Sequence, residues 1–547
     1  MNCTSRMRPI LVSFLAIALN TLLLMSCRTS STQLKSELAQ ASNDPVLFDD
    51  TFFFGIATAP AHAEDGLQDM WLDFARRQPN PGVKAWKNAG YPDLRLKFFT
   101  DYATEINLAK ELGSQVYRMG VDWGRLVPEK PIDTCPKSAT PCYAVNLDEA
   151  AVQRYLEILR YVRAQGMTPI LTLYHHSLPK WLQEARVDRR GKKNTGGWTN
   201  PDAIDLFDAF AQAIVPRFQD EVDTWIIFNE PAVFASLAYS AGIWPPAQGI
   251  NVLSILDLGF FKGDFVKAVD YMVEAHKRVY TSIKRLDTKA TGDRFTTGPA
   301  QVGIAHNVGY YTSGDRAGAA IANLFRENIN YKFIDGVIDS LDFLGLNYYG
   351  EEHIRSTSGL APRKDREYSE SGRGVNPNGF YESLKSFHER YLKGKRSIPI
   401  YITENGISDA TDILRPAYLL EHLAALDAAR KEGVPVQGYI FWTLSDNWEW
   451  ADGYCPKFGI VEVDRSTPEL RRIKRPSFEL YADIIRHHGF PQSVRDQAWQ
   501  AVRSRVGQLR PFCRSPDGQN SLDVPEQRPI VDQDWRFAIP SQALKNQ

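Results

Sequence analysis

Cysteine is scarce in this chain, and the few cysteines lack the spacing of a metal site. Six occur in 547 residues, at positions 3, 27, 135, 142, 455 and 513. There is no Cys-x-x-Cys pair and no His-Glu-x-x-His motif, the two patterns that most often mark protein-bound zinc. We therefore expect no metal and no cofactor. Cys135 and Cys142 share the loop "TCPKSATPC", where an oxidising compartment would allow a disulfide.

An excess of charge of either sign is also missing. Lys and Arg number 64 and Asp and Glu 65, so the formal net charge is −1 and the pI is about 6.8. A protein whose main partner is nucleic acid usually has a basic surface, so we expect no nucleic-acid partner. Hydrophobic residues make up 43% of the chain, enough for most of it to fold around a substantial core.

The first 27 residues are distinct from the rest. Arg6 and Arg8 precede an apolar run from Ile10 to Met25, which is typical of an export signal. The letters "LMSC" before residue 28 resemble a bacterial lipoprotein cleavage box, which would leave Cys27 as a lipidated N-terminus; the alternative is an uncleaved membrane anchor. We expect residues 28–47 to form a polar tether. The protein should then be exported and envelope-associated, held at the membrane by its N-terminus.

Eight short apolar runs, most of them followed by an amphipathic helical pattern, dominate the rest of the chain. Most of them end in or next to polar residues. The runs are "FFFGIATA" (52–59), "SQVYRMGV" (114–121), "TPILTLYHH" (168–176), "TWIIFNE" (224–230), "QVGIAHN" (301–307), "DFLGLNYY" (342–349), "IPIYITEN" (398–405) and "VQGYIFWTLSDN" (436–447).

This alternation predicts a parallel sheet covered by helices. Helices are expected, for example, over residues 149–166 and 416–433, the second beginning at Pro416 and ending at Gly433. Eight repeats favour a (β/α)8 TIM barrel with loop insertions over residues 48–490. A doubly wound sheet is the alternative. Residues 491–547 contain no further repeat, and we expect a C-terminal extension that packs on the barrel.

Two of the runs end in a carboxylate beside an amide. "TWIIFNEP" ends in Asn229 and Glu230, and "IPIYITENG" ends in Glu404 and Asn405. In a barrel of this kind the carboxyl ends of the strands form the active-site face, so the two glutamates should meet there. A facing pair of carboxylic acids suits cleavage of a glycosidic bond. One protonates the leaving oxygen, and the other attacks the anomeric carbon or activates water. The general acid needs a raised pKa, to which the second carboxylate would contribute.

These residues also carry a family resemblance. "FNEP" and "YITENG" resemble the two signatures of glycoside hydrolase family 1, the retaining β-glucosidases and β-galactosidases. The similarity extends in the family's order through "FFFGIATAPAHAED", "YRMGVDWGRLVP", "TLYHHSLP", "FLGLNYYG" and "GYIFWTLSDNWEWADGYCPKFGIVEVD". It covers roughly residues 50–490, and it implies Glu230 as the acid/base and Glu404 as the nucleophile. Arg118 and Tyr349 match residues that contact and orient the nucleophile.

The resemblance also implies a sugar-binding pocket. Asn229 matches the contact to the 2-hydroxyl of the sugar, and Asn347 matches a neighbouring polar residue. The residues that match the pocket for the non-reducing sugar are His175, Trp442, Glu449 and Trp450. Three positions depart from the common pattern: His62 stands where most members have glutamine, and His176 with Ser177 replaces Trp-Asp after His175. These positions normally contact the 3- and 4-hydroxyls, and histidine keeps the pocket polar.

The departures resemble one branch of the family, the plant sensitive-to-freezing branch of galactolipid galactosyltransferases. The insertion at 245–269 and "RPIVDQDWRF" (528–537) resemble it too. The insertion is either a packed loop or a lip that meets lipid. We predict a retaining β-glycosidase acting on a terminal glucosyl or galactosyl unit of a small glycoside or glycolipid. The alternatives are a galactolipid:galactolipid galactosyltransferase and a sugar-binding protein without activity.

Overall fold

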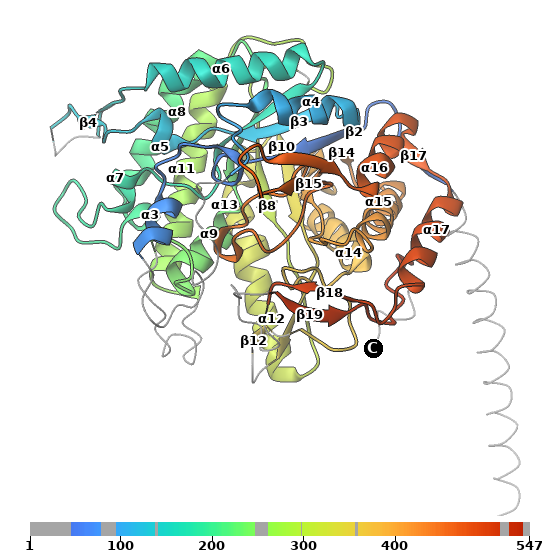
Figure 1. Ribbon diagram of the computed structural model, residues 1–547. Helices are drawn as coiled ribbons and strands as arrows, with labels where there is room; N and C mark the ends of the chain where they lie inside the picture. The colour runs from blue at the N-terminus through green and yellow to red at the C-terminus, as the bar shows by residue number, and fades with distance from the viewer. Residues whose placement is uncertain are drawn as a thin grey trace, which may run out of the picture.

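The centre of the computed structural model is a closed barrel of eight parallel strands (Figure 1). The structure describes residues 45–77, 95–136, 141–246, 261–296, 298–355, 359–360, 362–514 and 525–539. The barrel strands are β2 (Phe53–Ala57), β3 (Val116–Gly120), β6 (Thr168–Tyr174), β7 (Thr224–Asn229), β8 (Gln301–Asn307), β10 (Phe343–Tyr348), β13 (Ile400–Asn405) and β14 (Val436–Phe441). They coincide with the eight predicted runs. Because β14 pairs with β2 and closes the ring, the (β/α)8 prediction is confirmed and the doubly wound alternative is wrong.

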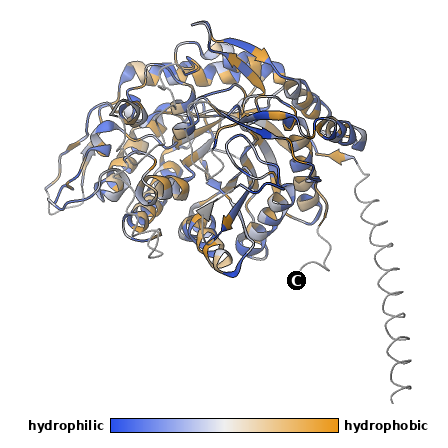
Figure 2. Ribbon diagram, turned by 60° about the horizontal axis from the view of Figure 1, so that its bottom comes forward, coloured by the Kyte–Doolittle hydropathy of each residue, from blue (hydrophilic) through white to orange (hydrophobic). Residues whose placement is uncertain are grey.

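Helices follow the strands and cover the outside of the barrel. The main ones are α4 (Tyr102–Leu112), α6 (Glu149–Ala164), α8 (Asp202–Phe218), α11 (Asp264–Leu286), α12 (Arg316–Phe325), α13 (Lys332–Val337), α14 (Pro377–Phe387), α15 (Arg415–Lys431) and α16 (Pro476–His487). Apolar and polar segments both occur along this outer layer (Figure 2). The two helices expected from the sequence are α6 and α15. α6 begins where the side chain of Asp148 accepts a hydrogen bond from Ala151 N, and Gly433 (φ 93°) lies in the left-handed region just beyond α15.

Neighbouring residues of each strand point to opposite faces, which separates two hydrophobic clusters. Phe54 and Ile227 belong to the large cluster between strands and helices, whereas Phe53 and Ile226 belong to the cluster inside the barrel. Glycine makes room there, because a Cβ atom on Gly438 would lie 2.1 Å from the ring of Phe53. The barrel interior is therefore filled with side chains, and any site must lie at its ends.

Many short elements follow the carboxyl ends of the strands. They include α2 (Pro60–Ala63), α3 (Met70–Arg77), α5 (Trp123–Leu126), α7 (Lys180–Gln183), η3 (Gly197–Thr199), α9 (Pro231–Ala235), η4 (Ser236–Ser240), η6 (Arg326–Tyr331) and η9 (Trp450–Asp452). Two others, η7 (Ile338–Ser340) and η8 (His388–Leu392), come before strands β10 and β13. A small three-stranded sheet contains β9 (Tyr310–Ser313), β11 (Glu351–Arg355) and β12 (Gly359–Leu360). Two two-stranded sheets pair β4 (Ile132–Asp133) with β5 (Tyr143–Ala144), and β15 (Val461–Asp464) with β16 (Arg471–Lys474). β9 and β11 directly follow barrel strands β8 and β10, so this sheet lies beside their carboxyl ends.

The C-terminal residues fold back against the barrel layer. α17 (Gln492–Arg503) contacts α15. After it, β18 (Leu509–Phe512) pairs with β19 (Glu526–Pro529). This strand pair lies at the same end of the molecule as α12 and β12 (Figure 1). Two buried ion pairs hold this segment. Arg495 Nη2 lies 2.6 Å from Glu421 Oε2, and Arg510 Nη2 lies 2.6 Å from Glu367 Oε1. Breaking a buried pair of this kind leaves an uncompensated charge, so the segment is an integral part of the fold.

The N-terminal predictions fall mostly outside the described residues, as do residues 247–260 of the insertion. Next to the first described residue, Val46–Leu47 forms β1, which pairs antiparallel with β17 (Gly489–Phe490). The last residues of the expected tether (28–47) therefore belong to a two-stranded sheet. Residues 264–269 of the insertion form the first turns of α11, with Phe265 buried. Within the described part of the chain, no helix has the length and apolar content needed to span a membrane.

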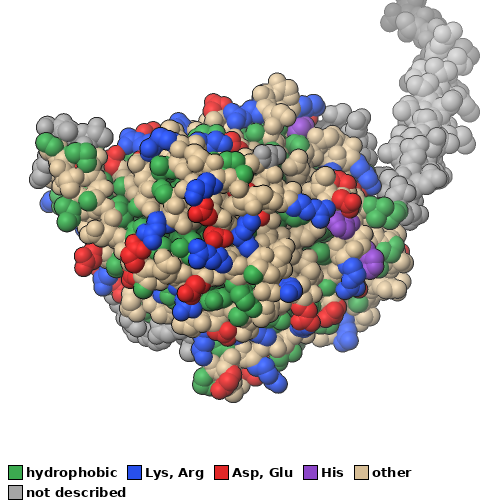
Figure 3. Space-filling model, turned by 90° about the horizontal axis from the view of Figure 1, so that it is seen from above, with side chains coloured by type: hydrophobic (Ala, Val, Ile, Leu, Met, Phe, Trp, Pro, Cys, Tyr) green, Lys and Arg blue, Asp and Glu red, His purple; other side chains and the backbone are tan. Residues whose placement is uncertain are grey.

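Two further predictions can be compared with the structure. Cys135 and Cys142 form a disulfide, which the sequence allowed but left open. On the face of the molecule seen in Figure 3, basic and acidic side chains are interspersed rather than gathered by sign, in keeping with the balanced composition.

Candidate active site

The two predicted glutamates lie at the carboxyl ends of β7 and β13. Glu404 is the fifth residue of β13, and Glu230 follows β7 directly, with its backbone in the left-handed region (φ 42°) at the start of α9. Glu230 N donates to Ala305 O of the neighbouring strand across 2.7 Å. A non-glycine residue in this conformation is uncommon and is concentrated at functional sites. Both side chains are buried: Glu230 is 8% and Glu404 3% exposed.

Two donors hold Glu404, one on each oxygen. Arg118 Nη1, from β3, donates to Oε1 across 2.6 Å, and the hydroxyl of Tyr349 donates to Oε2 across 2.6 Å. Burial raises the pKa of the Glu404 carboxyl to about 7, against the lowering effect of Arg118. The carboxylate form is therefore available at neutral pH, held in a fixed orientation by charge-assisted hydrogen bonds.

Glu230 has a different set of neighbours. Its Oε1 accepts from Asn347 Nδ2 across 2.9 Å and from Asn307 Nδ2 across 3.3 Å. Its Oε2 lies 3.8 Å from His176 Nε2. Burial raises the pKa of the Glu230 carboxyl, but His176 and the two amides lower it by more, so this pKa lies below its usual value.

This electrostatic pattern differs from the sequence-based expectation, which placed the raised pKa on the acid/base. The structure raises the pKa of Glu404 and lowers that of Glu230. The reason is the unequal set of partners: Glu230 has the His176 imidazole and two amide donors beside it, whereas Glu404 is buried more deeply. The sequence argument considered only the repulsion between the two carboxylates.

Asn229 connects the two glutamates. Its Oδ1 accepts from Arg118 Nη2 across 2.7 Å and from Asn347 Nδ2 across 3.1 Å, so Arg118 reaches Glu404 on one side and Asn347 reaches Glu230 on the other. Thr403 Oγ1 in turn donates to Asn347 Oδ1 across 2.6 Å. Because both carboxylates share one hydrogen-bonded frame, a change in this frame should affect both of them.

The predicted sugar pocket is an aromatic and polar cluster beside this frame. Trp442 Nε1 donates to Glu449 Oε1 across 3.1 Å, and burial raises the pKa of the Glu449 carboxyl well above its usual range. The ring of His62, carried by α2, lies 4.2 Å from that of Trp450 and 4.9 Å from that of Trp442, between ring centroids. His62 Nδ1 also contacts Trp448 O. Aromatic faces beside hydrogen-bonding groups suit a pyranose, which presents apolar C–H faces and polar edges.

The two consecutive histidines complete the pocket. Asn229 Nδ2 lies 2.9 Å from His175 Nε2 and 3.4 Å from His176 Nε2. The left-handed backbone of His176 (φ 61°) turns the chain immediately after β6. The structure thus brings together all twelve residues predicted from the sequence: Glu230, Glu404, His62, Arg118, His175, His176, Asn229, Asn347, Tyr349, Trp442, Glu449 and Trp450.

Sequence analysis missed Asn307 and Thr403. Asn307 is the last residue of β8, so the argument that polar residues at strand ends gather on one face could have found it. Thr403 acts behind the pocket, through Asn347, and no sequence signal distinguishes it from a strand residue.

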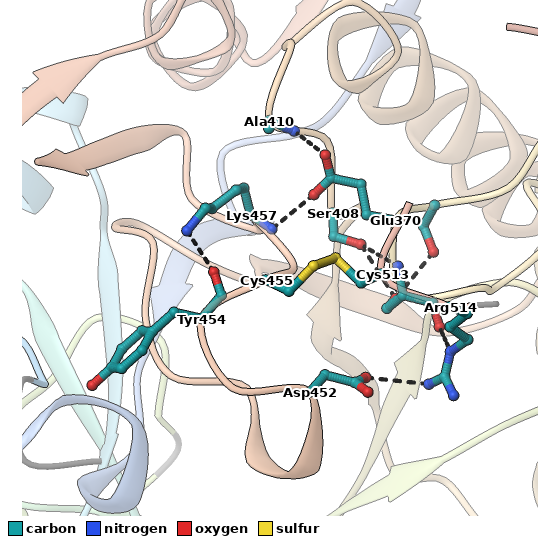
Figure 4. The surroundings of a disulfide bond; sticks show 11 residues. Glu370, Ser408, Ala410, Asp452, Tyr454, Cys455, Lys457, Cys513 and Arg514 are labelled. Carbon is teal, nitrogen blue, oxygen red and sulfur yellow. Dashed lines mark hydrogen bonds and ion pairs between the residues drawn. A yellow bond between two sulfur atoms is a disulfide. The ribbon is translucent and has the colours of Figure 1, made fainter. Parts of the chain in front are cut away.

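A second disulfide was also missed. Cys455, in the loop after η9, is bonded to Cys513, which follows β18 (Figure 4). Arg514 Nη2 lies 3.2 Å from Asp452 Oδ2, and Cys513 N donates to Glu370 O across 2.9 Å. Because Trp450 and Asp452 belong to one turn, the disulfide ties the C-terminal segment to a wall of the pocket.

Comparison with known proteins agrees with this geometry. A family profile described as "Glycosyl hydrolase family 1" matches residues 45–310 and 319–490. The chain belongs to glycosyl hydrolase family 1. Its relatives include a protein of Arabidopsis thaliana named "Galactolipid galactosyltransferase SFR2, chloroplastic", 40% identical over 542 residues, which cover 89% of this chain and 82% of the relative. A β-galactosidase of Pyrococcus woesei is 28% identical over 82% of this chain and 99% of its own length.

Solved structures of family 1 show the same fold. The family 1 β-glucosidase of Thermotoga maritima superposes with a TM-score of 0.65 at 25% identity, covering 81% of this chain and 99% of its own. The predicted resemblance to family 1, and to its galactolipid galactosyltransferases, is therefore confirmed. This family 1 chain is an enzyme of the glycoside hydrolase type.

Proposed function

We propose that this enzyme transfers galactosyl units between galactolipids, with retention of configuration. One observation carries the proposal. The relative named as a galactolipid galactosyltransferase is 40% identical over 542 residues, and a rice relative named "Beta-glucosidase-like SFR2, chloroplastic" is 38% identical over 572 residues. The relatives named as a β-galactosidase or as β-glucosidase A are 27–29% identical. The sequence-based prediction ranked hydrolysis first and transfer second, and the comparisons favour the reverse order.

The site geometry supports the first half of the reaction. Glu404, oriented by Arg118 and Tyr349, attacks the anomeric carbon of the galactosyl unit. The bond from that carbon to the glycosidic oxygen breaks, and the leaving oxygen takes a proton from Glu230. A covalent galactosyl-enzyme remains, with Glu230 ionised.

The second half decides between transfer and hydrolysis. Glu230, now a base, removes a proton from the incoming hydroxyl, whose oxygen displaces Glu404 from the anomeric carbon. A sugar hydroxyl as acceptor gives a lengthened galactolipid, and water gives free galactose. The same two carboxylates serve both outcomes, so the outcome depends on how well the acceptor side holds a sugar.

Hydrolysis of β-glucosides or β-galactosides is the second candidate. The observation that favours it is the set of groups around Glu230 and Glu404, which resembles that of a retaining glycosidase. A relative of 28% identity is named a β-galactosidase, and the compared structure is a family 1 β-glucosidase.

Partitioning of the galactosyl-enzyme separates the two candidates. An aryl β-galactoside serves as the donor, and galactolipid in detergent micelles is added as the acceptor. A transferase should release the aryl group at a similar or higher rate while free galactose falls and a galactosylated lipid appears. Free galactose equal to the released aryl group at every acceptor concentration contradicts transfer. Binding of the aryl galactoside without any release would instead indicate a sugar-binding protein.

We also propose that the enzyme works at an envelope membrane, attached through residues 1–27. The apolar run behind Arg6 and Arg8 supports this proposal, and a lipid substrate requires access to a membrane surface. Intact-mass analysis tests it. A mature chain that begins at acylated Cys27 indicates a lipoprotein, an intact Met1 indicates an uncleaved anchor, and an unmodified chain that begins elsewhere contradicts both.

A further inference from the structure

A charge cluster of two ion pairs lies beside the pocket. Arg373 Nε lies 2.9 Å from Glu352 Oε1. Arg514 Nη2 lies 3.2 Å from Asp452 Oδ2, a contact drawn in Figure 4. Glu352 raises the pKa of the Arg373 guanidinium most, and Asp452 also raises it. Burial raises the pKa of the Asp452 carboxyl, whereas Arg514 and Arg373 lower it. The two ion pairs therefore act on each other as one cluster.

One half of the cluster is attached to the chain that carries Tyr349, the residue whose hydroxyl donates to the nucleophile. Glu352 belongs to β11, which begins directly after Gly350. A Cβ atom on Gly350 would lie 3.4 Å from Arg373 Cβ and 2.2 Å from Gly374 O. The chain around Arg373 therefore packs directly against the residue that follows Tyr349, and glycine at position 350 permits this close approach.

The other half is attached to the turn that forms a wall of the sugar pocket. Asp452 ends η9, which begins at Trp450, and Asp452 N donates to Glu449 O across 2.9 Å. Arg514 comes from the C-terminal segment and packs beside Arg373, because a Cβ atom on Gly372 would lie 2.5 Å from Arg514 Cδ. The cluster thus connects the chain after β10 to the turn that carries Trp450. Arg514 itself lies beyond residue 490, where the match to the family profile ends.

The position of Glu230 indicates which side of the pocket the cluster serves. Besides Glu352, the charge of Glu230 raises the pKa of the Arg373 guanidinium, so this guanidinium and the Glu230 carboxylate are near neighbours. In the proposed reaction Glu230 protonates the oxygen of the leaving group, and the acceptor later enters on the same side. The donor sugar occupies the aromatic pocket of Trp442 and Trp450 instead. The cluster therefore lies on the acceptor side.

The cluster has hydrogen-bonding capacity that the protein does not use. The side chain of Arg373 is 37% exposed, and those of Glu352, Asp452 and Arg514 are 14–16% exposed. Within the described residues, both terminal nitrogens of Arg373 and Nη1 of Arg514 have no hydrogen-bond partner. Guanidinium groups donate to sugar hydroxyls, and carboxylates accept from them. Because two arginines and two carboxylates carry no net charge, the cluster suits a neutral ligand rich in hydroxyl groups rather than an anion.

We propose that this charge cluster holds the galactosyl headgroup of the acceptor lipid, so that the C-terminal segment supplies part of the acceptor site through Arg514. The inference rests on the proposed function, because it names the residues that favour a sugar over water. A headgroup held there presents one hydroxyl to Glu230, which takes its proton, while the hydroxyl oxygen displaces Glu404 from the anomeric carbon. Water makes none of the headgroup's additional contacts, so the bound sugar reacts in preference to it.

The test is the ratio of lengthened galactolipid to free galactose that the full-length enzyme forms from monogalactosyl diacylglycerol in detergent micelles. Both products come from the same galactosyl-enzyme, so the ratio does not depend on the first half of the reaction. Arg373→Met and Arg514→Met should each lower it roughly 10-fold or more, for loss of hydrogen bonds to a charged group, and Arg373→Lys should lower it less. Arg536→Met is the matched control, because Arg536 pairs with Asp534 at an exposed position of the same C-terminal segment. An unchanged ratio in both methionine variants, or an equal fall in Arg536→Met, overturns the inference.

A second measurement needs no variant. The wild-type enzyme receives an aryl β-galactoside as donor and methyl β-galactoside, methyl β-galacturonide or 1-hexanol as acceptor, and mass spectrometry quantifies the transfer products. Methyl β-galactoside should compete with water at the lowest concentration. A preference for the galacturonide would indicate an anion site, and a preference for hexanol an apolar acceptor surface; either result overturns the inference. If the wild type forms no lengthened galactolipid, the proposed function itself fails. Wild-type transfer with unchanged ratios in Arg373→Met and Arg514→Met rejects only the role of the cluster.

Discussion

The hydroxyl of Tyr349, the residue that follows β10, donates to Oε2 of Glu404 across 2.6 Å, whereas Arg118 donates to the other oxygen, Oε1. This contact lowers the pKa of Glu404, against the burial that raises it. Tyr349 therefore has two effects on the proposed nucleophile: it fixes the orientation of the carboxylate, and it favours the charged form that attacks.

Replacing Tyr349 with phenylalanine should impair both effects. Without the donor, the pKa of Glu404 should rise, so the acid limb of the kcat/KM profile should move to higher pH, and kcat should fall roughly 10-fold or more for loss of one hydrogen bond to a charged group. Tyr348→Phe is the matched control, because the Tyr348 hydroxyl donates to Asn376 O, outside the pocket. Equal effects of the two substitutions would indicate damage to the fold rather than to Glu404.

The wild-type acid limb should itself lie close to neutral pH. The nucleophile must be ionised, and burial raises the pKa of Glu404 to about 7. Activity should therefore rise as pH increases through about 7. The profile of kcat/KM with a dinitrophenyl glycoside, which does not depend on the general acid, isolates this limb. A midpoint near 4.5, the ordinary value for a glutamate, would show that Arg118 and Tyr349 outweigh burial.

The two glutamates should respond differently to conversion into glutamine. Glu404→Gln should form no covalent glycosyl-enzyme by intact-mass analysis with a fluorinated glycoside. In Glu230→Gln, kcat/KM should fall roughly 10²- to 10⁴-fold for phenyl glycosides, which is the usual contribution of general acid catalysis. For dinitrophenyl glycosides, kcat/KM should fall much less. A glycosyl-enzyme in Glu404→Gln, or an equal loss on both substrates in Glu230→Gln, would reverse or reject the assigned roles.

The Cys455–Cys513 disulfide should stabilise the pocket as well as the fold. Its cysteines lie 58 residues apart, against 7 for Cys135–Cys142. Chain entropy alone gives about 4 kcal/mol for the longer loop and about 2.5 kcal/mol for the shorter one. Replacing Cys455 and Cys513 with serine should lower Tm more than the matched pair Cys135→Ser and Cys142→Ser. It should also raise KM, because the turn with Trp450 is attached to Cys455. An unchanged KM would show that other contacts hold this wall.

Much of the barrel and its site could be predicted because strand ends are encoded locally. Apolar runs that stop at Asn229, Glu230, Glu404 and Asn405 need only a closed parallel sheet to place those residues on one face. Family motifs then added positions such as Arg118 and Glu449.

The remainder depended on contacts that no local pattern encodes. The approach of His176 to Glu230 joins two strands, and it decides which glutamate has the lowered pKa. Cys455 pairs with Cys513, 58 residues further along the chain, and the β1–β17 pairing joins residues 46–47 to residues 489–490. Such contacts follow from the folded arrangement, so the electrostatics of the site became clear only with the structure.

The proposed transfer reaction is tested most directly by incubating the full-length enzyme with monogalactosyl diacylglycerol alone and separating the lipid and water-soluble products by chromatography. Glu404→Gln serves as the blank. If the galactosyl-enzyme passes its sugar to a second galactolipid, diacylglycerol should appear together with lipids that carry two or more galactosyl units, and all of these should be absent from the Glu404→Gln reaction. Free galactose and diacylglycerol in equal amounts, with no lengthened galactolipid, would contradict transfer and identify the enzyme as a hydrolase.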